Sequence, residues 1–172
     1  IINKTKPENI ESYNWPKDWV DLAKDSSGRK KRVVFYNTSI GELLADGESF
    51  LTKLRFVLEA FRSRNDLLLL WRPHPLSRET YTSMRPAYRD EYKTIVAEYR
   101  TSGYGIYDDS VDLYRAIAFS DIYYGTRSSL TLQYQGIGKP VIRQSSAVLD
   151  NKENPNASMR YLNDWTANLI NN

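Results

Sequence analysis

The feature that most constrains the fold is the apolar run at residues 67–71, Leu-Leu-Leu-Leu-Trp, which ends in Arg72-Pro73-His74-Pro75. A half-buried strand alternates apolar and polar residues, whereas this run contains no polar residue. Such a run is typical of a strand buried on both faces, and these strands belong to parallel sheets covered by helices. The run therefore predicts an α/β fold.

Strand and helix patterns alternate along most of the chain. Further strands are predicted at 32–37, 105–107, 121–124 and 140–143, and residues 38–41 are predicted to be a loop. Helices are predicted at 47–64, at 77–100 with a break near Pro86, at 110–119 with Asp109 or Ser110 as the cap, and at 128–135. This alternation predicts a doubly wound parallel sheet, Rossmann-like, of about five strands with helices on both faces.

The chain divides into a lead-in and one domain. Residues 1–31 contain a predicted short helix at 16–23, and we expect Trp15 and Trp19 to anchor this segment on the main body. Residues 32–172 form the predicted Rossmann-like nucleotide-binding domain, which ends in a helix at 157–170. Because residues 1–31 are too few for a second domain, we expect the chain to be a fragment or an excised domain.

Composition excludes several classes of protein. The 172 residues are 41% hydrophobic and 26% charged, which is typical of a globular domain. The chain has no cysteine and one histidine, so we expect no zinc site. We also expect no other metal, because no cluster of carboxylates with metal spacing faces the predicted cleft, and no cofactor. The net charge of +3 is modest and the sequence has no nucleic-acid-binding motif, so nothing supports a nucleic-acid partner. No apolar run approaches the ~20 residues of a membrane-spanning helix.

The single histidine, His74, lies where the apolar strand at 67–71 ends. Ligands of open α/β sheets bind at the carboxyl ends of the strands. The flanking prolines stiffen the loop, and Arg72 places a cation two residues before the imidazole. These residues suit an anionic ligand, most simply a phosphate. A rigid turn whose histidine caps a carbonyl explains the segment equally well, so both interpretations stay open here.

A second candidate loop, Gly125-Thr126-Arg127-Ser128-Ser129, joins a predicted strand to a predicted helix. Glycine allows a tight turn, and a helix start offers N–H groups and a positive dipole end to phosphate. An ordinary serine cap is the alternative. The added threonine and arginine favour a phosphate site formed by residues 126–129. Gln133, one turn further on the same side, is positioned for a hydroxyl of that ligand, although a surface glutamine is common.

Two weaker candidates follow the other strands. Asp108 comes after the third strand and is suited to a nucleoside, although capping of the next helix is the alternative. Ser39 follows the first strand in a loop of small residues, which allows a ligand to approach. The chain has neither G-x-G-x-x-G nor a Walker A motif, which disfavours dinucleotide dehydrogenases and P-loop NTPases.

The order of these motifs resembles the C-terminal, donor-binding half of GT-B glycosyltransferases. It is most similar to the CDP-glycerol glycerophosphotransferases of teichoic-acid synthesis and to related capsule-polysaccharide proteins. The segments that carry the resemblance lie between residues 32 and 143: Val34 to Ser39, Arg72-Pro73-His74-Pro75, Asp112-Leu113-Tyr114, Ser120-Asp121-Ile122, Thr126-Arg127-Ser128-Ser129 and Gly138-Lys139-Pro140-Val141-Ile142.

The resemblance implies roles for particular residues. In that family the histidine of the His-Pro motif, here His74, binds the donor pyrophosphate and assists its departure. The paired serines, here Ser128 and Ser129, bind phosphate. The chain departs from the family where Thr126 replaces an aspartate and where Gln133 replaces an acid that holds the donor ribose. Ser39 matches a threonine of the family.

The resemblance also implies partners and a location. We expect a nucleoside-diphosphate donor, either CDP-glycerol or a nucleotide sugar, and an N-terminal domain of the same protein that supplies the acceptor site. The isolated chain is then expected to bind nucleotide without transferase activity. We expect a cytoplasmic location, with peripheral association of the full-length protein at the inner face of the membrane, and no nucleic-acid partner.

Two other functions stay open on the residues alone. A non-catalytic flavodoxin-like or receiver-like module shares the fold class, although the acids of a receiver are missing after the first strand. A sugar-nucleotide epimerase-like domain uses similar phosphate loops, but it needs acids near the sugar, and the predicted cleft has few of them.

Overall fold

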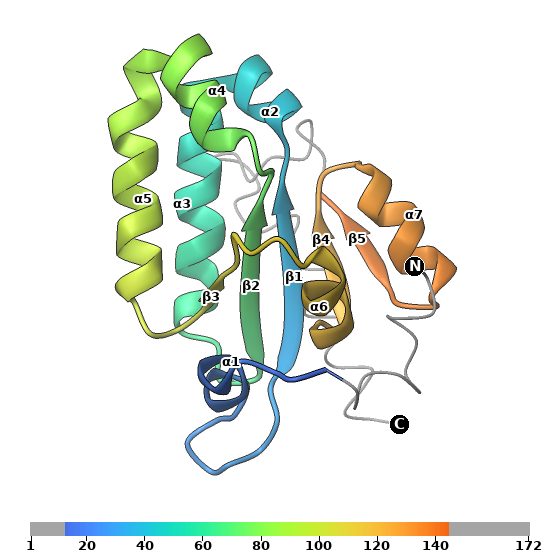
Figure 1. Cartoon of the computed structure of the whole chain (residues 1–172). Helices are drawn as coiled ribbons and strands as arrows, with labels where there is room; N and C mark the ends of the chain where they lie inside the picture. Colours follow the sequence, from blue (N-terminus) through green and yellow to red (C-terminus); the bar gives the residue numbers. More distant parts are fainter. Residues whose placement is uncertain (1–12, 145–172) are drawn as a thin grey trace, which may run out of the picture.

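The computed structural model describes residues 13–144, so the predicted terminal helix at 157–170 lies outside the described part of the chain. Five parallel strands form one sheet in the order β3-β2-β1-β4-β5. Their bounds are β1 (Arg32–Thr38), β2 (Leu67–Pro73), β3 (Ile106–Tyr107), β4 (Ile122–Gly125) and β5 (Val141–Arg143). The predicted α/β fold with a parallel sheet is confirmed, and Figure 1 shows its arrangement.

Helices cover both faces of the sheet because alternate strand residues point to opposite sides. One face carries Val34, Leu69 and Trp71, and it packs against helices from the first half of the domain. The other face carries Phe35 and Leu70, and it packs against helices at the two ends of the described chain. The first group is α2 (Ile40–Asp46), α3 (Glu48–Arg62), α4 (Ser77–Met84) and α5 (Arg89–Thr101); the second is α1 (Lys17–Leu22), α6 (Leu113–Phe119) and α7 (Ser129–Gly136).

Most predicted elements are present, with two corrections. Residues predicted as a loop after β1 instead begin α2, and Ser39 is its N-cap, which accepts a hydrogen bond from the Glu42 N–H. The helix predicted from Ser110 begins later, because Asp112 caps α6 by accepting from the Arg115 N–H at 3.1 Å. The predicted break near Pro86 is a 3-10 turn, η3 (Pro86–Tyr88), between α4 and α5.

Trp15 and Trp19 of the lead-in pack on the domain, as the sequence predicted. Trp19 is 5% exposed and lies in the core of the second face. Trp15 and Trp19 each contact the Phe119 ring of α6, with ring centres 5.1 and 5.3 Å apart. Within residues 13–144 no helix is both long and apolar enough to cross a membrane.

The strand order distinguishes between classes of parallel sheet. Flavodoxin-like and receiver domains use the order 2-1-3-4-5, whereas dinucleotide-binding domains use 3-2-1-4-5-6. The observed order, β3-β2-β1-β4-β5, follows the second pattern. The flavodoxin-like alternative is therefore wrong for the topology of this sheet.

Candidate functional site

The candidate site lies at the carboxyl edge of the sheet, where the arrowheads of β1 and β2 point in Figure 1. The chain passes from β1 to β2 and β3 on one side and then crosses to β4 on the other. The change of direction between β1 and β4 is the switch point at which open α/β sheets bind ligands. The loops after β1, β2 and β4, with Ser39, His74 and Ser128, all leave the sheet at this edge.

His74 is held by its backbone while its ring is exposed. Its N–H donates to the Thr38 carbonyl at 3.0 Å, and its carbonyl accepts from the Ser77 N–H at 2.9 Å. The ring Nδ1 accepts from the Leu76 N–H at 3.2 Å, so the neutral tautomer carries its proton on Nε2. The ring therefore accepts a hydrogen bond from an N–H, whereas the alternative prediction had it donate to a carbonyl. The Nε2–H remains as a donor on the exposed ring.

Ser128 is the N-cap of α7, and its hydroxyl is fully engaged. Its Oγ accepts from the Leu130 N–H at 3.2 Å and lies 3.2 Å from the Tyr123 hydroxyl. Burial raises the pKa of Tyr123 to about 12, so this phenol keeps its proton, which it donates to the Thr126 carbonyl at 2.6 Å. The Ser128 hydroxyl must therefore donate to Tyr123. Of the two predicted serines, Ser128 thus fixes the helix start.

Ser129 and Arg127 remain available at the same helix start. Both side chains are exposed, and neither makes a hydrogen bond or ion pair within residues 13–144. The first N–H groups of a helix have no acceptor within it, and the dipole end there is positive. Gln133 lies one turn further along α7 and is partly buried. The phosphate roles of Arg127, Ser128 and Ser129 and the nucleoside role of Gln133 stay predictions.

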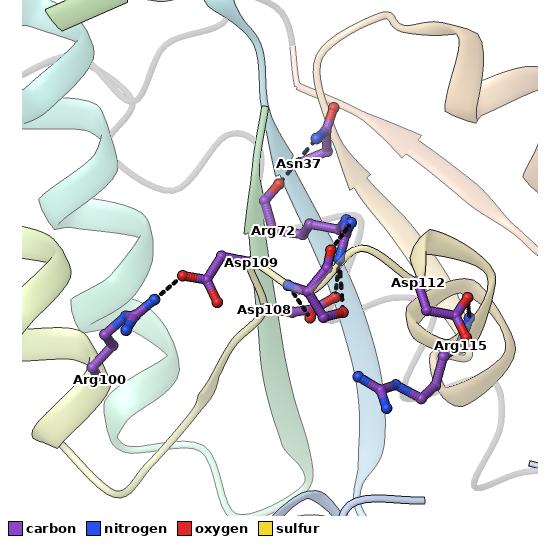
Figure 2. Close-up of polar contacts among 8 residues, drawn as sticks. Asn37, Arg72, Arg100, Asp108, Asp109, Asp112 and Arg115 are labelled. Atoms are coloured by element: carbon purple, nitrogen blue, oxygen red, sulfur yellow. Dashed lines mark hydrogen bonds and ion pairs between the residues drawn. The ribbon is translucent and has the colours of Figure 1, made fainter. Parts of the chain in front are cut away.

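Arg72 and Asp108 form a buried ion pair with each other, as Figure 2 shows. Their side chains are 8% and 2% exposed. The Arg72 guanidinium also donates to the Ser110 carbonyl at 2.6 Å, and Asp108 accepts from the Ser110 N–H at 3.1 Å. Arg72 and Asp108 thus each use their charge on the other. The phosphate role of Arg72 and the nucleoside role of Asp108 stay predictions.

Glu42 joins the loops on either side of the switch point. Its Oε2 accepts from the Thr126 hydroxyl at 2.9 Å and lies 3.4 Å from the Ser39 Oγ, while its Oε1 forms an ion pair with Lys53 of α3. The hydroxyls predicted to contact phosphate (Thr126) and nucleoside (Ser39) are thus engaged with Glu42. Glu42 is not among the residues predicted for the site, although Ser39-Ile40-Gly41-Glu42 matches the S-x-x-E capping box.

Gly125 is required where β4 ends against β1. Its φ is +149°, and a Cβ placed there would lie 2.6 Å from the Asn37 carbonyl oxygen. Such a contact is far inside van der Waals distance, so a side chain would push the two strand ends apart. Gly125 therefore sets how closely the loop bearing Thr126 and Ser128 approaches the end of β1.

A hollow of about 580 Å³ lies at the opposite, amino-terminal edge of the sheet. It is lined by Trp15, Phe119 and Lys139 among others. Lys139 donates to the carbonyls of Ile117 and Ala118 at 2.7 and 3.1 Å, so it caps the end of α6. Burial lowers the pKa of Lys139 to about 8. This hollow does not adjoin the loops after β1, β2 and β4, so its size does not support the predicted site.

The fold and the carboxyl edge define an α/β domain of the Rossmann-like class. In the part of the chain that the structure describes, no group of three or more histidine and acidic side chains is arranged to hold a metal. A scan against models of known protein families and a search of curated proteins gave no match to this chain. The resemblance to GT-B transferases therefore stays a prediction.

Proposed function

We propose that this domain binds the diphosphate of a nucleotide donor for a glycosyl- or glycerophosphotransferase of cell-surface polymer synthesis. The ligand lies across the switch point, with its phosphates between His74 and the start of α7. The donor is CDP-glycerol or a nucleotide sugar, and the role proposed here is that of binding the donor.

One observation carries the proposal: three exposed side chains at this edge keep a donor or a cation that has no partner within residues 13–144. They are the His74 Nε2, the Arg127 guanidinium and the Ser129 hydroxyl, and they flank the end of β1 from two loops. Anions bind at helix starts because the free N–H groups and the helix dipole favour negative charge. A ligand that satisfies all three groups is anionic and long enough to contact both loops, as a diphosphate is.

The same groups suit the chemistry of transfer. When the bond to the nucleotide breaks, negative charge develops on the leaving phosphate. Donors that are already in place stabilise that charge without reorganising. The His74 ring is oriented by Leu76 and the Ser128 cap by Tyr123, so both sides of the proposed phosphate site are fixed before the ligand binds.

Titration calorimetry with CDP, UDP, GDP and cytidine tests the proposal. We expect the three diphosphates to bind and cytidine to bind far less well, because the proposed contacts are to phosphate. His74→Ala and Arg127→Ala should each weaken CDP binding by about 1–3 kcal/mol, the scale for a hydrogen bond to a charged group.

Arg62→Ala is the matched control for Arg127→Ala. Arg62 is an exposed arginine in the last turn of α3, and α3 ends at the amino edge of the sheet. Its loss removes the same charge from the protein and should leave the affinity for CDP unchanged. Equal affinity for cytidine and CDP, or equal weakening by Arg62→Ala and Arg127→Ala, would end the proposal.

A further inference from the structure

Glu42 and Lys53 form an ion pair that is buried beside the candidate site. Their side chains are 10% and 4% exposed. Taking two charges out of water is costly, and a buried pair of this kind is often no more stable than apolar residues of the same volume. Stability alone is therefore a weak explanation for a glutamate and a lysine at these positions.

The pair is connected to the candidate site through both oxygens of Glu42. Oε1 contacts Lys53, while Oε2 accepts from the Thr126 hydroxyl at 2.9 Å. Thr126 lies two residues before Ser128, which is the N-cap of α7. The Thr126 carbonyl accepts a hydrogen bond from the Tyr123 hydroxyl, and that hydroxyl also contacts Ser128. The carboxylate thus holds the loop that presents the start of α7 at the switch point.

The negative charge of Glu42 is unfavourable beside a site that binds an anion. A lone carboxylate here repels phosphate, and protein around it screens this repulsion less than water does. Lys53 pairs with Oε1, the carboxylate oxygen that Thr126 does not contact, and cancels the charge. The loop is therefore held by a carboxylate without making the site repel anions.

We propose that Glu42 is a positioning residue of the diphosphate site and that Lys53 is the counter-charge that keeps this site neutral towards anions. The inference rests on the proposed function. It predicts that the two members of the pair have opposite effects on anion affinity. If the pair were purely structural, replacing either Glu42 or Lys53 would weaken anion binding, or leave it unchanged, in the same way.

The test measures the dissociation constants of CDP and of inorganic pyrophosphate by calorimetry in about 0.15 M salt, where exposed charges further than about 8 Å from a ligand are largely screened. Glu42→Gln keeps an acceptor for Thr126 but leaves Lys53 uncancelled, so binding should tighten about fivefold or more. Lys53→Met leaves the carboxylate uncancelled, so binding should weaken about tenfold. Each change is of the order expected for one unscreened charge near the ligand.

The double variant Glu42→Gln/Lys53→Met restores a neutral pair and should bind both probes within about twofold of the wild-type protein. If Lys53→Met does not fold, Glu42→Gln and the double variant still decide the question. The matched control is Glu98→Gln, which makes the same change in net charge at an exposed pair with Arg55 on the outer surface of α3 and α5. It should leave both dissociation constants unchanged.

The outcomes separate this inference from the proposed function. Tightening by Glu42→Gln together with wild-type affinity in the double variant supports the role of the pair. Weakening by Glu42→Gln, or no change beyond twofold in any of the three variants, overturns it while the proposed function stands. If the wild-type protein binds neither CDP nor pyrophosphate, the proposed function fails and this inference fails with it.

Discussion

Arg72→Met tests whether the arginine at the end of β2 is structural. The guanidinium and its partner Asp108 are 8% and 2% exposed, and both also bond to Ser110. Removing one member of a buried pair leaves the other charge uncompensated, which costs about 3–5 kcal/mol. Methionine keeps most of the apolar stem of arginine, so the lost free energy reflects the charge and its hydrogen bonds more than a cavity.

The free energy of unfolding is measured by urea titration, with the fluorescence of the four tryptophans as the signal. We expect Arg72→Met and Asp108→Asn each to lower it by about 3–5 kcal/mol, and the double variant to lose at least about 2 kcal/mol less than the sum. Because domains are stable by only about 5–15 kcal/mol, Asp108→Asn serves as the second variant if Arg72→Met is unfolded.

The neighbouring pair of Arg100 and Asp109 is the matched control, and Figure 2 shows it beside Asp108. Its side chains are 47% and 63% exposed. Exposed pairs contribute little, so Arg100→Met should cost less than about 1 kcal/mol. If Arg72→Met costs no more than Arg100→Met, the structural role of Arg72 is wrong. If it also abolishes CDP binding, Arg72 is a ligand-binding residue.

Buried tyrosines give two further predictions. The Tyr81 hydroxyl is buried and has no hydrogen-bond partner among residues 13–144, whereas the Tyr99 hydroxyl donates to the Leu69 carbonyl at 2.7 Å. In urea titrations Tyr81→Phe should therefore raise the free energy of unfolding by about 1 kcal/mol, and Tyr99→Phe should lower it by about 1 kcal/mol; the reverse order would contradict this account. Burial raises the pKa of Tyr99 and Tyr134 above the ordinary value of 10.0, and that of Tyr123 to about 12. As pH rises above 10, these tyrosines therefore ionise in the unfolded chain before they ionise in the folded protein, and the free energy of unfolding falls. Urea titrations above pH 10 should show a loss of up to about 1.4 kcal/mol per pH unit for each such tyrosine. The tyrosinate absorbance of these buried tyrosines should appear only with unfolding, whereas partly exposed ones such as Tyr88 and Tyr114 can ionise in the folded protein.

Much of the fold could be predicted because its signals are local. The run at 67–71 is apolar throughout, so it predicted a strand buried on both faces, and β2 is buried along its whole length. The helix α2 was missed because it is short and includes Gly41, which is unfavourable within helices. Its S-x-x-E start, from Ser39 to Glu42, was the signal that would have identified it.

The candidate site was harder to predict because its decisive contacts join residues far apart in sequence. Nothing near Arg72 in the chain shows that Asp108, 36 residues later, takes up its charge. Lys53 did carry a signal: it lies three residues after Phe50 and four before Val57, on the apolar face of α3. A lysine on such a face needs a buried partner, but the sequence does not say which acid provides it.

The contacts at the carboxyl edge separate its polar residues into two layers. Arg72 pairs with Asp108, and Glu42 pairs with Lys53 and accepts from Thr126, so these residues form a satisfied layer against the ends of the strands. His74 and Ser129 rise from loops beyond that layer and keep open groups. Because a satisfied polar layer resists rearrangement, it fixes the loops without offering contacts to a base or a sugar. Selectivity at this edge should therefore arise from the charge of the phosphates, and CDP, UDP and GDP should differ far less from one another than any of them differs from its nucleoside.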